Sequence, residues 1–297
     1  MRDFTPANPR LSVIIVSYNA RDTITACLES LEHQAAVEDF EVILVDSSND
    51  GTGDLVASAF PGVRLLRFSE RKYPGDARNI GIAAVRSDII AFIDADCRAD
   101  RHWVSEILKA HRQPHLAIGG AVANGDPASY VGWAAYLCEF SQWMPAEGPR
   151  WLADIPTANM TYKRAVFEKF GRFIEGTYSS DTELHWRLAR AGHRLRWEPS
   201  LLVWHTCIDR LGKFLRHEFR HGRSFGRVRV RGRGFGAAKR LLYVLATPLI
   251  PWKLMAAIFL RVLRDRTTLP HFLRTLPVLA LGVVSWCLGE CRGYAGR

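Results

Sequence analysis

The stretch "IIAFIDADCRAD", residues 89–100, decides the fold prediction. Its opening residues are apolar and predict a buried strand, after which two carboxylates, Asp94 and Asp96, follow one residue apart. Two aspartates at a strand end project in roughly the same direction and suit a hard divalent cation such as Mg²⁺ or Mn²⁺. A single pair of this kind is also common as a turn or helix cap, so its surroundings have to decide between the two interpretations.

The neighbouring segments predict alternating strands and helices. Short β-branched runs alternate with segments whose apolar residues recur at helical spacing, a pattern typical of a parallel α/β sheet. In such sheets ligands bind at the carboxyl ends of the strands, where Asp46, Asp94 and Asp96 fall. The predicted strands are 11–19, 40–48, 63–70, 88–96 and 201–205, and the predicted helices are 21–33, 75–87 and 181–191.

Composition and charge narrow the class of protein. The chain has 297 residues, 48% of them hydrophobic, and a formal net charge of +10, which favours anionic partners such as nucleotides or phospholipid headgroups. Its six cysteines form no C-x-x-C pair, which indicates neither a zinc site of that type nor a disulfide framework and suits a reducing compartment. No basic-then-apolar leader precedes Leu11, so we expect the N-terminal part in the cytoplasm.

Several motifs together resemble a known family. They are "LSVIIVSYNA" (11–20), "VILVDSSNDGTGDL" (42–55), "GDARNIGIAAVRSDIIAFIDADC" (75–97), "NMTYKRAVFEKFGRF" (159–173) and "SSDTELHWRLARAGHRL" (179–195). In this order they resemble the inverting glycosyltransferases of family 2, membrane-associated type. The resemblance implies a GT-A fold, a Rossmann-like, mostly parallel sheet flanked by helices. The catalytic domain would span 1–210, with a donor-binding half at 11–118 and an acceptor half at 119–210, followed by a basic helix and apolar membrane-associated helices at 211–297.

The resemblance also implies donor-binding residues. Asp46 would contact the nucleotide base or ribose, Arg78 would help to hold the donor, and Asp94 would bind the ribose or the donor sugar. As alternatives from the residues alone, Asp46 could be a turn former and Arg78 a solvated helix residue. The loop "DSSNDGT" (46–52) is one residue shorter than the family's usual motif and has Ser47 after Asp46, which bears on base specificity.

The same resemblance implies a metal site and a catalytic base. Asp96 and His205 would hold Mg²⁺ or Mn²⁺, and Asp181 would deprotonate the acceptor hydroxyl in a single inverting displacement. Asp181 also suits a helix cap, and His205 a core histidine. The family's Glu-Asp pair is here Ser180-Asp181, so the proposed base is present and the acid before it is not.

The implied activity is transfer of a sugar from a nucleotide-sugar donor to a lipid-linked or glycan acceptor in envelope or exopolysaccharide synthesis. A nucleotidyltransferase would need a glycine-rich loop after the first strand, and "VSYNARDT" (16–23) is not one. The alternative function is a membrane-bound scaffold or nucleic-acid-binding protein on a degenerate GT-A domain. The coincidence of Asp46, Asp94, Asp96 and Asp181 speaks against it, and we expect no nucleic-acid partner. The sequence makes no prediction of oligomeric state.

The C-terminal part combines a basic run with apolar stretches. In the run, His217, Arg220 and Arg223 share one face of a predicted helix. The resemblance to membrane-associated relatives implies that this helix closes on the donor diphosphate, with Arg220 and Arg223 as donor-binding residues. The apolar stretches are 241–260 and 275–289. They suit helices at the membrane interface or re-entering it, helices that span it, or helices buried in a soluble fold. Basic residues on both sides of the first stretch favour the cytoplasmic face of the membrane.

Overall fold

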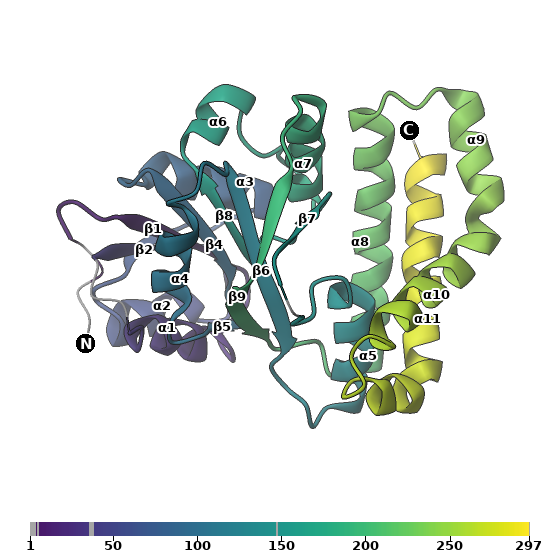
Figure 1. The fold of residues 1–297 in the computed structure, drawn as a ribbon, viewed down its shortest axis with the longest axis horizontal. Helices are drawn as coiled ribbons and strands as arrows, with labels where there is room; N and C mark the ends of the chain where they lie inside the picture. The colour runs from purple at the N-terminus through teal and green to yellow at the C-terminus, as the bar shows by residue number, and fades with distance from the viewer. Residues whose placement is uncertain (1–3, 5, 36–38, 147, 297) are drawn as a thin grey trace. The chain divides into compact units, whose positions relative to one another are not determined.

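The computed structural model, which describes residues 4, 6–35, 39–146 and 148–296, divides the chain into two units (Figure 1). The first contains Met1–Ala123 and Pro145–His205, and the second contains Asn124–Met144 and Thr206–Arg297. The sequence analysis placed 124–144 in the acceptor half of the catalytic domain, whereas here this segment packs with the C-terminal helices. Aromatic packing accounts for the difference, since Trp133 stacks on His271 at 3.9 Å between ring centroids.

A parallel half-sheet forms the beginning of the first unit. Strand β1 lies between β2 and β4, and β3 is added beyond β2. The register pairs Ser17 with Asp46 and Val16 with Asp94, so both aspartates lie at the same edge of the sheet, as predicted. The strands are β1 (Leu11–Ser17), β2 (Phe40–Asp46), β3 (Arg64–Arg67) and β4 (Ile89–Asp94).

The remaining strands make the sheet mixed. Among the described residues the sheet has nine strands. These pairs are antiparallel: β4 with β8, β6 with β8, β5 with β9, and β7 with β9. The prediction of a mostly parallel sheet therefore holds for the first half only, because a buried strand has the same apolar pattern in either direction. These strands are β5 (Cys97–Ala99), β6 (Ala117–Asn124), β7 (Arg150–Leu152), β8 (Asn159–Lys163) and β9 (Leu195–His205).

Amphipathic helices flank this sheet. In α1 the residues at helical spacing, Ile24, Cys27, Leu28 and Leu31, are all buried, which confirms the predicted apolar face. The predicted helices at 75–87 and 181–191 correspond to α3 and α7, with ends that differ by a few residues. The helices are α1 (Ile24–Glu32), α2 (Thr52–Ala59), α3 (Pro74–Ala84), α4 (Trp103–Ala110), α6 (Ala165–Phe170) and α7 (Ser180–Arg190).

The second unit is helical, and its two longest helices pack closely. Helices α8 and α11 lie side by side (Figure 1), with glycines of each against the backbone of the other. A Cβ at Gly222 would lie 2.1 Å from the carbonyl oxygen of Trp286, and one at Gly289 would lie 2.1 Å from that of Phe219. The helices are α5 (Tyr130–Phe140), α8 (Leu211–Gly232), α9 (Ala237–Ala246), α10 (Ile250–Val262) and α11 (Leu269–Ala295).

Two segments of this unit are long and apolar enough to cross a membrane. They are Ala237–Val262 and Leu269–Ala295. In the apolar window of each segment, 11% of the first and 44% of the second is buried. The first is not one continuous α-helix, since a 3₁₀ turn at Thr247–Leu249 separates α9 from α10. Pro248 and Pro251 lie at this break, where each removes a backbone hydrogen-bond donor. Because so little of Ala237–Val262 is buried, much of the apolar surface of this segment is exposed.

Candidate functional site

Asp46 ends β2 and is held by hydroxyl groups from both sides. Its Oδ1 accepts hydrogen bonds from the hydroxyls of Ser17, at 2.6 Å, and Ser48, at 2.5 Å. The short loop after it closes on itself, because Asp50 Oδ1 accepts from the amide and the hydroxyl of Thr52. Ser48 lies in this short loop, and its hydroxyl orients the carboxylate of Asp46, which is predicted to bind the donor.

Arg78 faces the second predicted donor residue. Its Nη2 lies 3.5 Å from Oδ1 of Asp94, and its side chain is buried. Two neighbours in the same motif position the helix: Asn79 exchanges hydrogen bonds with the backbone of Phe173, and Gly75 allows α3 to approach the start of α7. A Cβ at Gly75 would lie 2.2 Å from the carbonyl oxygen of Ile174 and 3.1 Å from the hydroxyl oxygen of Ser180. The motif therefore joins α3 to the segment that carries Asp181.

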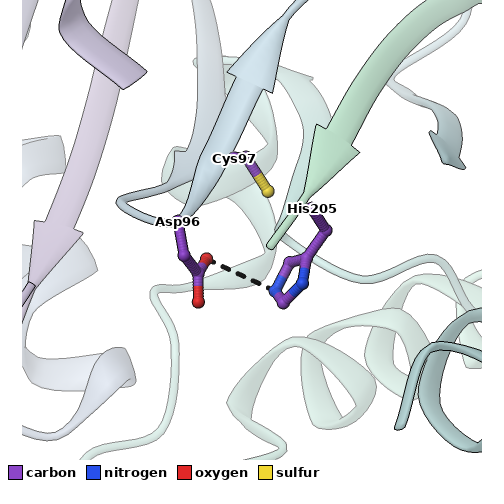
Figure 2. Close-up of side chains that lie close together, drawn as sticks. All are labelled: Asp96, Cys97 and His205. Atoms are coloured by element: carbon purple, nitrogen blue, oxygen red, sulfur yellow. Dashed lines mark ion pairs between the residues drawn. The ribbon is translucent and has the colours of Figure 1, made fainter. Parts of the chain in front are cut away.

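Asp96 and His205 face each other at the ends of their strands (Figure 2). Asp96 follows β4, His205 is the last residue of β9, and Asp96 Oδ1 lies 3.3 Å from His205 Nε2. This oxygen is buried and receives no hydrogen bond from the described residues. A carboxylate oxygen and an imidazole nitrogen are suitable ligands for Mn²⁺ or Mg²⁺, so the residues present fit the metal that the family implies.

Cys97 lies beside this pair, and its chemistry is different. Ligand atoms of Asp96, Cys97 and His205 lie within 4.8 Å of one another. Burial raises the pKa of the Cys97 thiol well above its ordinary value, and the charges of Asp96 and Asp94 raise it further. The thiol is therefore protonated at neutral pH, which leaves oxygen and nitrogen as the ligands for a hard cation.

Asp181, the predicted base, lies in the first turn of α7. Its Oδ2 accepts from the hydroxyl of Thr157, at 3.0 Å, and its Oδ1 accepts from the amide of Thr182, at 2.9 Å. Burial raises the pKa of this carboxyl, but Arg78, His185 and the backbone hydrogen bonds outweigh burial, so its pKa lies below the ordinary value. Asp181 is therefore ionised at neutral pH and able to accept a proton.

The charged groups act on one another. The pKa of Asp94 is raised, mainly by burial. The charges of Arg78 and His205 lower this pKa, and those of Asp96 and Asp181 raise it. The strand register, the Arg78–Asp94 contact and the Asp96–His205 contact bring these predicted residues together at one end of the sheet, and Asp181 is near enough to affect the pKa of Asp94. Arg220 and Arg223 lie on α8 in the second unit, and their predicted role in donor binding stays a prediction.

A hydrogen-bonded network near Asp181 was not predicted from the sequence. His185 Nδ1 lies 2.5 Å from Asp154 Oδ1, and its Nε2 lies 2.6 Å from the hydroxyl oxygen of Tyr162. Asp154 also accepts from Thr182, which neighbours the proposed base. The available signal was the spacing of Asp181 and His185, four residues apart on one helix face. Asp154 follows no periodic pattern, and only the tertiary structure brings it to this position.

Comparison with known proteins supplies the family. The sequence model described as "Glycosyl transferase family 2" matches residues 12–171, more than half of the chain. The chain belongs to this family. The match contains β1, β4 and the Asp94–Asp96 pair, and it confirms the resemblance inferred from the sequence motifs.

Individual relatives agree with this assignment. The chain is 28% identical over 235 residues to the pre-mycofactocin glycosyltransferase of Mycobacterium tuberculosis, covering 76% of this chain and 49% of that protein. It is 27% identical to the glycosyltransferase AglE of Haloferax volcanii, covering 74% of each chain. The chain thus spans about half the length of the mycobacterial relative.

A solved structure supports the fold. The mannosyltransferase PcManGT of Pyrobaculum calidifontis, in complex with GDP-Man and Mn²⁺, superposes with a TM-score of 0.65 at 19% identity. The superposition covers 95% of this chain and 87% of that one. At this identity the likeness establishes the fold, which is the GT-A fold that the sequence predicts.

Proposed function

We propose that this protein is a metal-dependent, inverting glycosyltransferase that moves a sugar from a nucleotide-sugar donor to an acceptor hydroxyl. One observation carries the proposal: Asp96 and His205 lie 3.3 Å apart, with the Arg78–Asp94 pair and the ionised Asp181 at the same end of the sheet. This arrangement offers a site for a metal cation, a cationic side chain that can bind the nucleotide-sugar donor, and a base. Such a transfer needs these three groups.

The metal would be held by Asp96 and His205. When bound, Mn²⁺ or Mg²⁺ neutralises negative charge that develops on the departing nucleoside diphosphate. Arg78 is buried and paired with Asp94, so its guanidinium is held in place before the donor arrives. Asp46, oriented by Ser17 and Ser48, would bind the base or ribose of the donor.

Asp181 would act as the base. Its carboxylate is kept ionised by Arg78 and His185 and is oriented by Thr157 and Thr182. It would take the proton from the acceptor hydroxyl as that oxygen attacks the anomeric carbon from the face opposite the leaving group. One displacement of this kind inverts the anomeric configuration and needs no covalent intermediate.

The acceptor and the location follow from the apolar surface. Exposed leucines and Trp252 cover α9 and α10, and Trp252 is 77% exposed. Such a surface, flanked by arginines and lysines, suits insertion into the headgroup region of a membrane. We therefore propose the cytoplasmic face of the membrane as the location and a lipid-linked or growing glycan as the acceptor. Relatives named for succinoglycan biosynthesis and for teichoic acid polymerisation support a role in polysaccharide assembly.

The test measures release of nucleoside diphosphate from a set of nucleotide sugars by the full chain in detergent. GDP-mannose comes first, because PcManGT was solved with it. We expect turnover of one donor with Mn²⁺ or Mg²⁺, its loss on chelation, and a decrease of about a hundredfold or more in Asp96→Ala. Asp88→Asn is the matched control, since the Asp88 side chain is fully exposed before β4. If no donor turns over, the catalytic proposal is wrong and the scaffold alternative gains support.

A further inference from the structure

A second cluster of metal-ligating side chains lies within the helical unit. Glu139 comes from α5, and His217 and Glu218 come from α8. One carboxylate oxygen from each glutamate and one ring nitrogen of the histidine lie within 4.8 Å of one another. His217 Nε2 is 3.7 Å from Glu139 Oε2. The cluster shares no residue with the site described above.

Glu218 is an unusual residue for the inside of a helical unit. It is 1% exposed, and its Oε1 is buried without a hydrogen-bond donor among the described residues. Its Oε2 accepts a weak hydrogen bond from the thiol of Cys138, at 3.5 Å, and its carboxyl group is also in hydrogen-bonding contact with that of Glu139. A buried carboxylate oxygen without a partner is unfavourable, so this oxygen is suited to receive a ligand.

The charges around Glu218 lead to the same conclusion. A carboxylate oxygen of Glu218 lies within 4.8 Å of a carboxylate oxygen of Glu139. Within the described part of the chain, no lysine or arginine forms an ion pair with either glutamate. Two carboxylates this close need a cation or a shared proton between them.

We propose that Glu139, His217 and Glu218 bind one divalent transition-metal ion of the Zn²⁺ type, which joins α5 to α8. Two carboxylate oxygens and one imidazole nitrogen are a donor set that suits Zn²⁺. Ligand atoms of a tetrahedral zinc site are roughly 3.4 Å apart, so the separations here need only small side-chain rotations. Cys138, adjacent to Glu139 and in contact with Glu218, is available as the fourth ligand, because Zn²⁺, unlike a hard cation such as Mg²⁺, binds thiolate sulfur and would displace the thiol proton.

The bound ion would stabilise a contact between segments far apart in sequence. Between α5 and α8 the chain forms β7, β8, α6, α7 and β9, yet α5 and α8 both belong to the second unit. A metal bridge between them adds its binding free energy to the stability of that unit. The proposed role is therefore structural.

The experiment measures zinc binding by the full chain in detergent, after chelator dialysis, in competition with a chromophoric chelator. The background variant Asp96→Ala/His205→Ala removes binding at the other site. We expect it to retain one Zn²⁺ per chain, and we expect His217→Gln and Glu139→Gln each to weaken that binding at least about tenfold. His102→Gln, which removes an exposed imidazole elsewhere, should bind zinc unchanged.

Two further measurements separate loss of a ligand from loss of folding. His217 is 38% exposed, so His217→Gln should melt like the parent without metal, while the rise in melting temperature on adding Zn²⁺ should disappear. With Co²⁺ in place of Zn²⁺, a sulfur-to-metal charge-transfer band that vanishes in Cys138→Ser would identify the fourth ligand. Zinc binding that is equally tight in His217→Gln and Glu139→Gln, or absent from the background variant, would overturn the proposal and leave a proton shared by the two glutamates.

Discussion

The aspartates at the end of the sheet differ in environment more than in position. The carboxyl groups of Asp94 and Asp181 are both desolvated and both lie near Arg78, but Asp181 also accepts backbone hydrogen bonds from Thr157 and Thr182. The pKa of Asp181 is lowered, whereas that of Asp94 is raised. The same side chain is therefore suited to different tasks, because burial and partners decide which protonation state is favoured. Sequence spacing alone contains neither of these two contributions.

Substitution of Asp181 should separate acceptor transfer from donor cleavage. In Asp181→Asn the amide oxygen can still accept a hydrogen bond from Thr157 or Thr182, so the first turn of α7 should be retained. The carboxylate that would take the proton from the hydroxyl of the sugar acceptor is lost. We expect transfer to fall by about 10²- to 10⁴-fold, with the donor KM nearly unchanged. Product formation on a membrane lipid extract and diphosphate release, measured in parallel, test this. Wild-type transfer by this variant would contradict the role as base.

Helix α4 provides a test of pH-dependent stability in the first unit. His111 caps α4, and its Nε2 lies 2.7 Å from the hydroxyl of Thr161, which itself donates to Ile118. Nε2 is therefore the protonated nitrogen, and Nδ1 is buried without a partner among the described residues. Burial lowers the pKa of His111 to about 4, with Lys163 and His115 contributing.

The sign of the effect follows from this lowered pKa. Because His111 binds its proton more weakly in the folded than in the unfolded chain, its contribution to stability is present above pH 6.5 and is lost as the pH falls toward about 4. The loss should reach roughly 3 kcal/mol at most. Denaturant titrations between these pH values should show it, with a smaller loss in His111→Gln. An equal slope in both proteins would exclude His111 as the cause.

The α8–α11 packing depends on glycine. A Cβ at Gly226 would lie 2.5 Å from the carbonyl oxygen of Glu290, and the contacts at Gly222 and Gly289 are closer still. Gly222→Ala should therefore separate the helices and lower the free energy of unfolding by about 1–3 kcal/mol. Gly212→Ala on the same helix is the matched control, since its Cβ would meet only Arg216 Nη1, at 3.5 Å. Chemical denaturation in detergent compares the two, and equal stability would refute close packing.

At the level of the complete chain, the charge and the apolar surface predict membrane binding. The triple variant Leu245→Ser/Leu249→Ser/Trp252→Ser removes side chains that are largely exposed, so folding should be little affected. Each would bury apolar area in a bilayer, and their loss should weaken binding to anionic vesicles at least tenfold. Vesicle flotation measures this, with Leu211→Ser as the control. Unchanged binding by the triple variant would show that this surface does not contact lipid.

Much of the first unit could be predicted because its signals are local. Strands β1, β2 and β4 are short apolar runs, and α1 has apolar residues at helical spacing. Asp46 and Asp94 are the last residues of β2 and β4. Parallel strands with carboxyl ends at one edge then bring those aspartates together without further information. The family match over 12–171 confirms the family resemblance of this part of the chain.

The remaining features depend on contacts between distant segments. The antiparallel addition of β8, the transfer of α5 to the helical unit, the Asp154–His185 pair and the glycine contacts of α8 and α11 have no local signature. Strand direction, helix partners and buried ion pairs are selected by how well whole surfaces pack and by which polar groups find partners. The sequence thus determined the elements and the acidic edge of the sheet, while packing between distant segments decided which side chains surround Asp181 and Glu218.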